Sequence, residues 1–285
     1  MFLKQNECVI VTAIYPNAKK FIKKFIKSLS IQTNKRFDLV IYNDGLRKYK
    51  KYFKNFKINY LVLSLNKKKY PSELRAILIK KTLNLGYKKL IFADIDDVMK
   101  KNRIFLVNKL LNKYDIVVND INLYKKNSKP VKNYFSKRLK KNSVFNLGKI
   151  MNGNFMGFTN TAAQSSVFLN KTILKSVKTE TYDWYLWSRC MLNKKIAFFT
   201  NKTSTNYTVN YENKTSLPHV ITKNYIKKQI DLKFKHYKLM VQLNYKYNQF
   251  LKRIIFLKNI INKEKDFKTI MGKINIKKNN FWCEI

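Results

Sequence analysis

Three aspartates, Asp94, Asp96 and Asp97, follow directly on the apolar residues 90–93. The short apolar run predicts a buried strand, and the aspartates stand where that strand should end. The chain has only 16 acidic residues among 285, so three within four positions is a high concentration. Like charges at this spacing raise one another's pKa unless a cation offsets them. The triplet therefore predicts a Mg²⁺ or Mn²⁺ site, since a helix N-cap, the structural alternative, needs only one aspartate.

Strands and helices are predicted to alternate through the first hundred residues. Helical spacing covers residues 18–29 and 72–85, and the predicted strands are residues 8–13, 37–42, 58–63 and 90–93. This alternation predicts an α/β fold with a mainly parallel sheet, whose ligands bind beyond the carboxyl ends of the strands. Thr12, Asp44 and Asp94 fall at such ends, so three strands direct polar groups at one crevice.

The second half of the chain is less regular. Residues 115–118 and 196–200 predict strands, residues 148–161 hold three of the six glycines and predict a loop close to a ligand, and residues 181–192 predict a helix. Residues 221–261 have helical apolar spacing and predict amphipathic helices that pack on the main domain or lie on a membrane surface. We expect a main domain over residues 1–216 and a C-terminal helical extension over 217–285.

The net charge of +44 raises the question of a polyanionic partner. The basic residues are 53 Lys and 7 Arg, spread along the chain. Base recognition and bidentate phosphate contacts favour Arg, so the charge indicates a compositional bias rather than specific nucleic-acid binding. It could still hold the protein on an anionic membrane surface.

Three features bear on the cellular compartment. The three cysteines are far apart in sequence, no apolar run approaches the roughly 20 residues of a membrane-spanning helix, and residues 1–7 are polar. We therefore expect no signal peptide and a cytoplasmic protein, with peripheral association at the inner face of the membrane as an extension of that prediction.

An ordered set of short segments resembles the family 2 glycosyltransferases over residues 7–216. The segments are residues 9–13, Asn43-Asp44-Gly45, Ser72-Glu73-Leu74-Arg75, Asp94-Ile95-Asp96-Asp97, Asn160-Thr161-Ala162 and Tyr182-Asp183-Trp184. The resemblance implies the GT-A fold, a Rossmann-like α/β fold. It also implies transfer of a sugar from a nucleotide diphosphate donor, such as a UDP-sugar, to an acceptor hydroxyl with inversion at the anomeric carbon. The acceptor would be a glycan or a lipid-linked sugar in cell-surface glycan biosynthesis.

The resemblance also implies which residues hold the donor's nucleotide. Thr12 and Asp44 would contact the nucleoside, and an ionised Asp44 could accept hydrogen bonds from the base or the ribose. Arg75 would bind the base or the diphosphate through its planar guanidinium. The structural alternatives are a turn residue for Asp44 and a surface side chain for Arg75.

The remaining implied roles concern the metal and the base. Asp94 and Asp96 match the DxD motif, in which Asp94 would bind the ribose and both would hold Mn²⁺ or Mg²⁺ on the diphosphate. Asp183 matches the catalytic aspartate, which takes the acceptor's proton from the opposite face of the sugar. A helix start would favour its ionised form, although a plain N-cap is the alternative.

One segment departs from the family pattern. Related enzymes often carry Tyr-Arg-x-His-x-x-Asn after the last strand, with a His that can reach the metal, whereas here Thr208 and Asn210 occupy the Arg and His positions. Asn210 could still offer an oxygen ligand, so we predict it as a third metal ligand.

Two other functions fit parts of the sequence. Residues 94–98 also fit the DxDx(T/V) loop of haloacid-dehalogenase-type phosphatases, with Asp94 as nucleophile, but a downstream Gly-Asp and Asp cluster is missing. The charge and the 18 Tyr and 20 Phe would suit a nucleic-acid-binding protein without catalysis. Such a protein has no use for an acidic triplet at a strand end.

Overall fold

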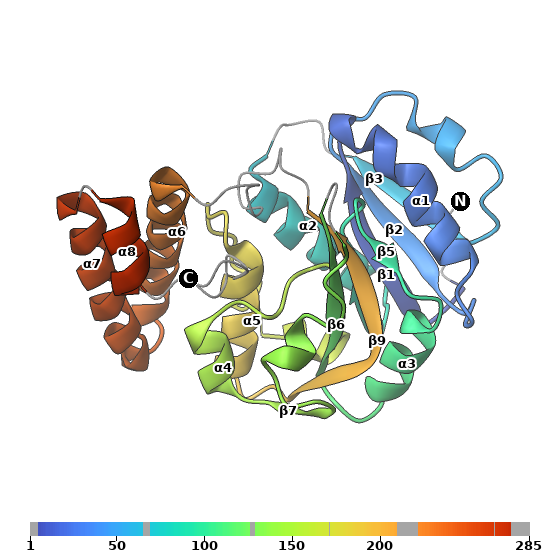
Figure 1. Cartoon of the computed structure of the whole chain (residues 1–285). Coiled ribbons are helices and arrows are strands. Elements are labelled where there is room, and N and C mark those ends of the chain that lie inside the picture. The colour runs from blue at the N-terminus through green and yellow to red at the C-terminus, as the bar shows by residue number, and fades with distance from the viewer. Residues whose placement is uncertain are drawn as a thin grey trace.

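The computed structural model of the chain describes residues 5–64, 69–125, 129–170, 172–209, 222–264 and 266–274. A nine-stranded sheet runs through the centre, and three helices of the C-terminal part lie together at one end (Figure 1). The strands are β1 (Cys8–Ile14), β2 (Asp38–Asn43), β3 (Tyr60–Ser64), β4 (Lys89–Phe92), β5 (Val98–Met99), β6 (Ile116–Tyr124), β7 (Ser143–Phe145), β8 (Thr161–Gln164) and β9 (Ala197–Thr208). The α-helices are α1 (Lys19–Ser30), α2 (Pro71–Asn84), α3 (Arg103–Leu110), α4 (Leu147–Asn152), α5 (Tyr182–Leu192), α6 (Lys223–Val241), α7 (Asn248–Lys263) and α8 (Phe267–Ile274).

The strand order is β3-β2-β1-β4-β8-β6-β9-β5, and β7 also pairs with β9. The block β3-β2-β1-β4 is wholly parallel, as is the pair β6 and β9, whereas β8 runs antiparallel to both of its neighbours. Consequently the carboxyl ends of β1, β2, β3, β4, β6 and β9 lie at one edge, together with the beginning of β8. The predicted mainly parallel α/β sheet is confirmed.

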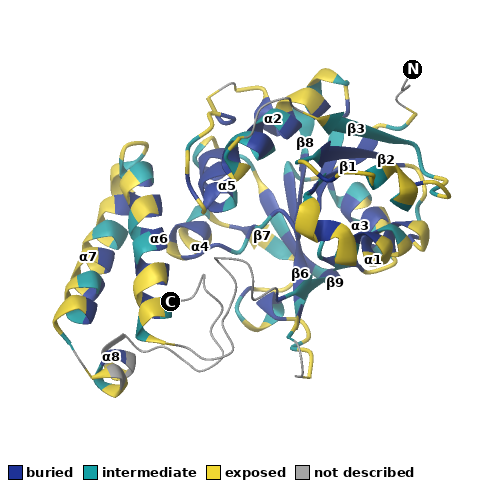
Figure 2. Ribbon diagram, turned by 90° about the horizontal axis from the view of Figure 1, so that it is seen from above, coloured by how far each residue is buried: buried dark blue, intermediate teal, exposed yellow. Residues whose placement is uncertain are grey.

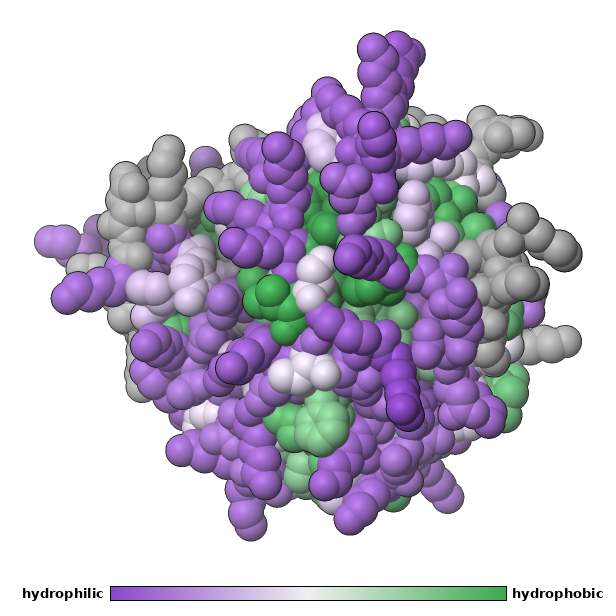
Figure 3. All heavy atoms as spheres, turned by 90° about the vertical axis from the view of Figure 1, so that its right-hand side faces the viewer, coloured by the Kyte–Doolittle hydropathy of each residue, from purple (hydrophilic) through white to green (hydrophobic). Residues whose placement is uncertain are grey.

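The first strands are mainly apolar because helices cover both faces of the sheet. Side chains alternate between faces along a strand, so Val9 and Val11 of β1 join the core beneath α2 and α5, whereas Ile10 joins the core beneath α1 and α3. The exposed face of α1 carries lysines, and Figure 3 shows the side of the molecule over α1 and β3 as largely hydrophilic.

Three features of the second half differ from the predicted elements. β9 extends eight residues beyond the expected end at residue 200, because it pairs with β6 along most of that strand's length. Residues 122–146, for which no element was predicted, contain the end of β6 and the short strand β7. The glycine-rich segment begins as α4 and becomes irregular only from Gly153.

The C-terminal part is helical, as predicted. Its helix α6 packs on α5, and α7 packs on α6 with an exposed outer face (Figure 2). The predicted domain boundary at residues 216 and 217 lies outside the described residues, so the division into two domains stays a prediction. Among the helices described, none is long and apolar enough to cross a membrane.

Candidate functional site

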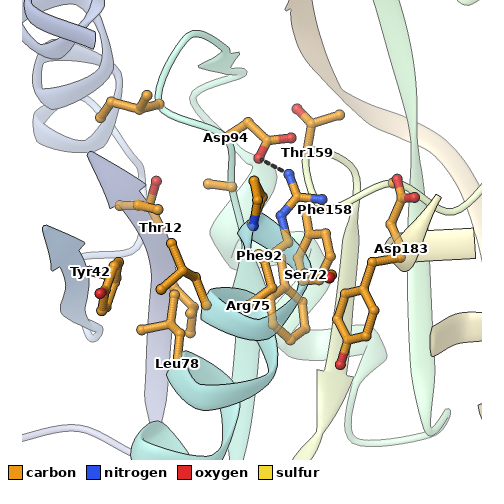
Figure 4. A pocket seen from close by; sticks show the side chains of 18 of the residues that line it. Thr12, Tyr42, Ser72, Arg75, Leu78, Phe92, Asp94, Phe158, Thr159 and Asp183 are labelled. Carbon is orange, nitrogen blue, oxygen red and sulfur yellow. Dashed lines mark hydrogen bonds and ion pairs between the residues drawn. The ribbon is translucent and has the colours of Figure 1, made fainter. Parts of the chain in front are cut away.

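A cavity of about 700 Å³ opens at the edge where the parallel strands end. Segments far apart in the sequence meet there, and Figure 4 shows their side chains converging. Six of the seven residues predicted from the sequence line this cavity: Thr12, Asp44, Arg75, Asp94, Asp96 and Asp183. The seventh, Asn210, lies outside the described residues.

Thr12 and Asp44 occupy the ends of β1 and β2, where strand geometry predicted them. Thr12 is buried, and its Oγ1 has no hydrogen-bond partner among the described residues, which leaves it available to a ligand. The turn after β2 does not need the Asp44 side chain. The Asn43 side chain accepts from the Leu46 amide at 2.8 Å, and Gly45 takes the left-handed conformation (φ +84°). The Asp44 carboxylate is thus free of the turn-forming role and lines the cavity.

Arg75 faces the cavity from the second turn of α2. That helix begins with Pro71 at its first turn, and Glu73 accepts from the Tyr70 amide at 2.9 Å, so its start is fixed by standard capping. The Arg75 Nη2 lies 3.3 Å from Asp94 Oδ1, and its guanidinium carbon lies 4.3 Å from the centre of the Phe158 ring. Arg75 therefore lines the cavity with its guanidinium held between Asp94 and Phe158.

The acidic triplet divides into two parts. Asp94 and Asp96 line the cavity, whereas Asp97 is 3% exposed and accepts from the Thr208 amide at 2.8 Å. Burial, and then the charges of Asp96 and Asp94, raise the pKa of Asp97 well above its ordinary value. Asp97 therefore connects the strand-end loop to the end of β9, and it does not face the cavity.

A divalent cation fits the two remaining carboxylates. Mg²⁺ and Mn²⁺ sites commonly use one or two carboxylates and complete their coordination with substrate phosphates and water. Within the described ranges no group of three or more His, Cys, Asp or Glu residues could hold a metal. Asp94 and Asp96 would therefore hold an ion together with ligand oxygens rather than as a complete protein site.

Asp183 lies in the first turn of α5, as the sequence predicted, and it lines the cavity. Its Oδ1 accepts from the Trp184 amide at 2.8 Å, and Asn154 also donates to its carboxylate. Burial raises the pKa of Asp183, while the charge of Arg75 and these hydrogen bonds oppose the rise. A half-buried carboxylate with a raised pKa is suited to general base catalysis.

Gly157 provides space beside Asp183. A Cβ at this position would lie 3.4 Å from Asn160 Oδ1 and 3.7 Å from Asp183 Oδ2. The Asn160 side chain also accepts from the Gly157 amide and donates to the carbonyls of Asn119 and Phe155. These bonds fix the loop before β8, and Gly157 of this loop lies beside the Asp183 carboxylate.

Other cavity residues carried no individual signal in the sequence. Asn154 and Phe158 stand in the glycine-rich segment, where only the glycines were informative. Glu180 lines the cavity, hydrogen-bonds to Tyr70, and lies 3.9 Å from Lys235 of α6. Such residues can be recognised as cavity residues only from the fold, which brings together the start of α2, the segment before α5, and α6.

Neither a protein-family model nor a curated protein matches this sequence. The fold, in contrast, resembles solved structures. Residues 1–349 of S. aureus TarS in complex with UDP share 14% identity with a TM-score of 0.62, and the match covers 95% of this chain and 75% of that one. The same TarS fragment in complex with UDP-GlcNAc gives 16% identity and a TM-score of 0.62, covering 95% and 76%.

Two further structures resemble the chain. The mannosyltransferase PcManGT from Pyrobaculum calidifontis, in complex with GDP-Man and Mn²⁺, shares 9% identity with a TM-score of 0.58, and the match covers 96% of this chain and 81% of that one. GalNAc-T7 with UDP, GalNAc and Mn²⁺ shares 12% identity with a TM-score of 0.55, covering 95% and 57%. At these identities the likeness shows the fold alone, and it confirms the GT-A fold.

Proposed function

We propose that the protein is an inverting glycosyltransferase of family 2, which moves a sugar from a nucleotide diphosphate donor, a UDP-sugar, to an acceptor hydroxyl. The observation that carries this proposal is the convergence of Thr12, Asp44, Arg75, Asp94, Asp96 and Asp183 on one cavity. They come from separate segments of the chain, and their order along it matches the family's. The complexes of TarS with UDP-GlcNAc and of PcManGT with GDP-Man support a nucleotide-sugar donor.

In this proposal the donor's nucleoside lies over the ends of β1 and β2. The unpartnered Thr12 hydroxyl and the Asp44 carboxylate would bind base or ribose groups. Arg75, stacked on Phe158, would bind the base or the diphosphate. Asp94, which lies beside Arg75, would bind the ribose and the metal.

A divalent cation would be held by Asp94 and Asp96, with Asn210 as a proposed third ligand. When bound, such an ion stabilises negative charge on the departing diphosphate as a Lewis acid. Mn²⁺ is present in the PcManGT and GalNAc-T7 structures, which supports Mn²⁺ or Mg²⁺ as the cofactor here.

Asp183 would accept the acceptor's proton. Its carboxylate stands across the cavity from Asp94, on a different helix from Arg75 (Figure 4). Because burial raises its pKa, Asp183 is a stronger base than an exposed aspartate. Attack from the face opposite the leaving group inverts the anomeric centre. The proposed acceptor is a glycan or lipid-linked sugar of the cell surface, which the protein would reach from the cytoplasm or the inner face of the membrane.

The experiment that tests this function is thermal unfolding of the purified chain with Mn²⁺ and, separately, UDP, GDP, dTDP and CMP. A ligand that binds only the folded state stabilises it by roughly 2.7 kcal/mol at 100 times its Kd. We expect one nucleotide to raise the melting temperature of the wild type and to have little effect on Asp96→Ala. Glu7→Ala, which removes an exposed carboxylate paired with Lys88, is the matched control and should respond as the wild type does.

A result in which no nucleotide stabilises the wild type with Mn²⁺ or Mg²⁺ would contradict the proposal. If a nucleotide stabilises Asp96→Ala as much as the wild type, the protein binds the nucleotide, but Asp96 does not hold the metal.

A further inference from the structure

The helix that bears Asp183 packs against α6 through aromatic side chains, among them a stacked pair. The ring of His236 in α6 lies face to face with the indole of Trp184 in α5, with centroids 3.7 Å apart and planes 11° from parallel. Both side chains are fully buried. This pair joins the residue next to Asp183 to a helix that contributes none of the cavity residues.

His236 has no conventional role in this position. Neither of its ring nitrogens has a hydrogen-bond partner among the described residues. Burial, and then the charge of Lys233, hold the pKa of His236 well below its ordinary value, so the ring is neutral. Burial of a polar ring without hydrogen-bond partners costs free energy of folding. The contact that the ring does make is the stacking of its face on Trp184.

Trp184 is held by several contacts, which include a T-shaped contact with the Tyr237 ring, with centroids 5.4 Å apart. The Trp184 amide donates to Asp183 Oδ1 at 2.8 Å, its indole Nε1 donates to the Ile150 carbonyl at 2.6 Å, and its ring face meets His236. Tyr237, the neighbour of His236, donates to the Met151 carbonyl at 3.0 Å. α6 therefore contacts both α5 and the end of α4.

These contacts lie next to two groups that donate hydrogen bonds to the Asp183 carboxylate. One is the Trp184 amide, and the other is Asn154, which follows α4 by two residues and hydrogen-bonds to the Asp183 carboxylate. Both partners of the carboxylate therefore lie next to groups that α6 contacts, namely the Trp184 ring and the Met151 carbonyl.

We propose that His236 is a positioning residue for the transfer reaction, whose ring fixes Trp184 and through it the orientation of the Asp183 carboxylate. The inference rests on the proposed role of Asp183 as base. It assigns to α6 a function in turnover, in addition to its contribution to stability. A displacement of about 1 Å at a reacting group can cost about 100-fold in rate.

The test compares His236→Ala and His236→Phe with the wild type. Release of UDP from UDP-GlcNAc, or of GDP from GDP-mannose, measures kcat and KM in the presence of Mn²⁺. We expect His236→Ala to lower kcat about 10- to 100-fold with an unchanged KM, because the donor contacts are intact. His236→Phe keeps a flat ring and should restore kcat to within about twofold of the wild type.

Ile230→Ala is the matched control for a purely structural effect. Ile230 is a buried core residue of the same helix, so its truncation should lower the melting temperature without changing kcat. An equal loss of kcat in Ile230→Ala and His236→Ala would overturn the inference. Full activity of the His236→Ala variant would also overturn the inference, provided that the Asp183→Asn variant is inactive.

A crystal structure of His236→Ala supplies a readout that does not need turnover. We expect the Trp184 ring to move and the bond between its amide and Asp183 to lengthen. An unmoved Asp183 carboxylate would overturn the inference, even if the wild type released no nucleotide from either donor. If the wild type shows no turnover but Asp183 is displaced in the variant, the result contradicts the proposed function and supports the positioning role of His236.

Discussion

The Arg75 guanidinium lies beside the Asp94 carboxylate, with 3.3 Å between Nη2 and Oδ1, while its plane lies over the Phe158 ring. Both side chains of the ion pair keep about a third of their exposure, so the pair stands at the cavity wall and is open to a ligand. Arg75 thereby supplies positive charge next to the predicted nucleotide and metal residues.

Arg75→Lys should weaken nucleotide binding even though the charge remains. Lys lacks the planar fork that can contact two oxygens and stack on Phe158 at the same time. A lost hydrogen bond to a charged group is worth about 1.5–3 kcal/mol, so we expect the Kd for the stabilising nucleotide to rise roughly 10- to 100-fold. Isothermal titration in the presence of Mn²⁺ measures it. Arg36→Lys, an exposed arginine away from the cavity, should bind as the wild type does.

Asp183→Asn should separate activity from stability. Loss of a general base lowers kcat about 10²- to 10⁴-fold, whereas the similar shape of Asn preserves the fold. The folded-state pKa of Asp183 is raised, so the protonated form is favoured on folding, and ionisation at neutral pH costs stability. We therefore expect Asp183→Asn to melt at or above the wild-type temperature at pH 7, and the difference to shrink as pH falls. A variant that melts lower at pH 7 and higher at acid pH would contradict this.

The pH dependence of turnover should follow the same carboxylate. A base must be ionised, so kcat should fall as pH decreases through the raised pKa of Asp183 in the complex. The acid limb should therefore lie above the pKa of an ordinary aspartate. A rate profile that stays flat down to pH 4 would argue that Asp183 is not the base.

Asp97→Ala should destabilise the protein, and Asp97→Asn should not. Alanine leaves the partly buried Thr208 amide without its acceptor, which costs about 1–3 kcal/mol, whereas Asn keeps a carbonyl oxygen and removes a buried charge. The raised pKa of Asp97 means that its stabilising protonated form is lost as pH rises through that pKa, so the advantage of Asn over Asp should grow with pH. Urea unfolding at pH 5 and pH 8 measures both effects. Equal stability of the Ala and Asn variants would remove the proposed connection to β9.

Removal of residues 222–285 should leave a poorly folded protein. α6 buries Trp184 through His236, and Ile226, Ile230 and Met240 belong to the same core as α5. Exposing that face removes a large apolar area from the core. Near-ultraviolet circular dichroism and the cooperativity of thermal unfolding would report the loss. A truncated chain that unfolds cooperatively near the wild-type temperature would show that residues 1–221 fold as an independent domain.

The sequence was most informative where polar residues stand at the ends of predicted strands. Thr12, Asp44 and Asp94 could be placed in one crevice because buried strands of a parallel sheet end at a common edge. The acidic triplet already contained Asp96, and the resemblance to the glycosyltransferases added Arg75 and Asp183. The structure places all three in the same cavity. Local sequence patterns are sufficient for such residues.

Other features depend on contacts between distant segments. Nothing in residues 94–97 distinguishes Asp97 from its neighbours, because its partner, the Thr208 amide, lies 111 residues away. His236 lies in the segment predicted to form amphipathic helices, but the helical spacing did not indicate that its ring is fully buried against Trp184. Both cases depend on contacts between distant segments, and the spacing of apolar residues along the sequence does not reveal such contacts.

The direction of β8 divides the cavity into two parts of different origin. Because β8 runs antiparallel to β4, the segment with Asn154 and Gly157 enters at the beginning of a strand, whereas Thr12, Asp44 and Asp94 leave from strand ends. In evolutionary terms, insertions or replacements before β8 would reshape the side of the cavity around Asp183 while the β1, β2 and β4 termini keep their spacing. Under the proposed function, such changes would alter the acceptor side of the cavity and leave the donor side unchanged.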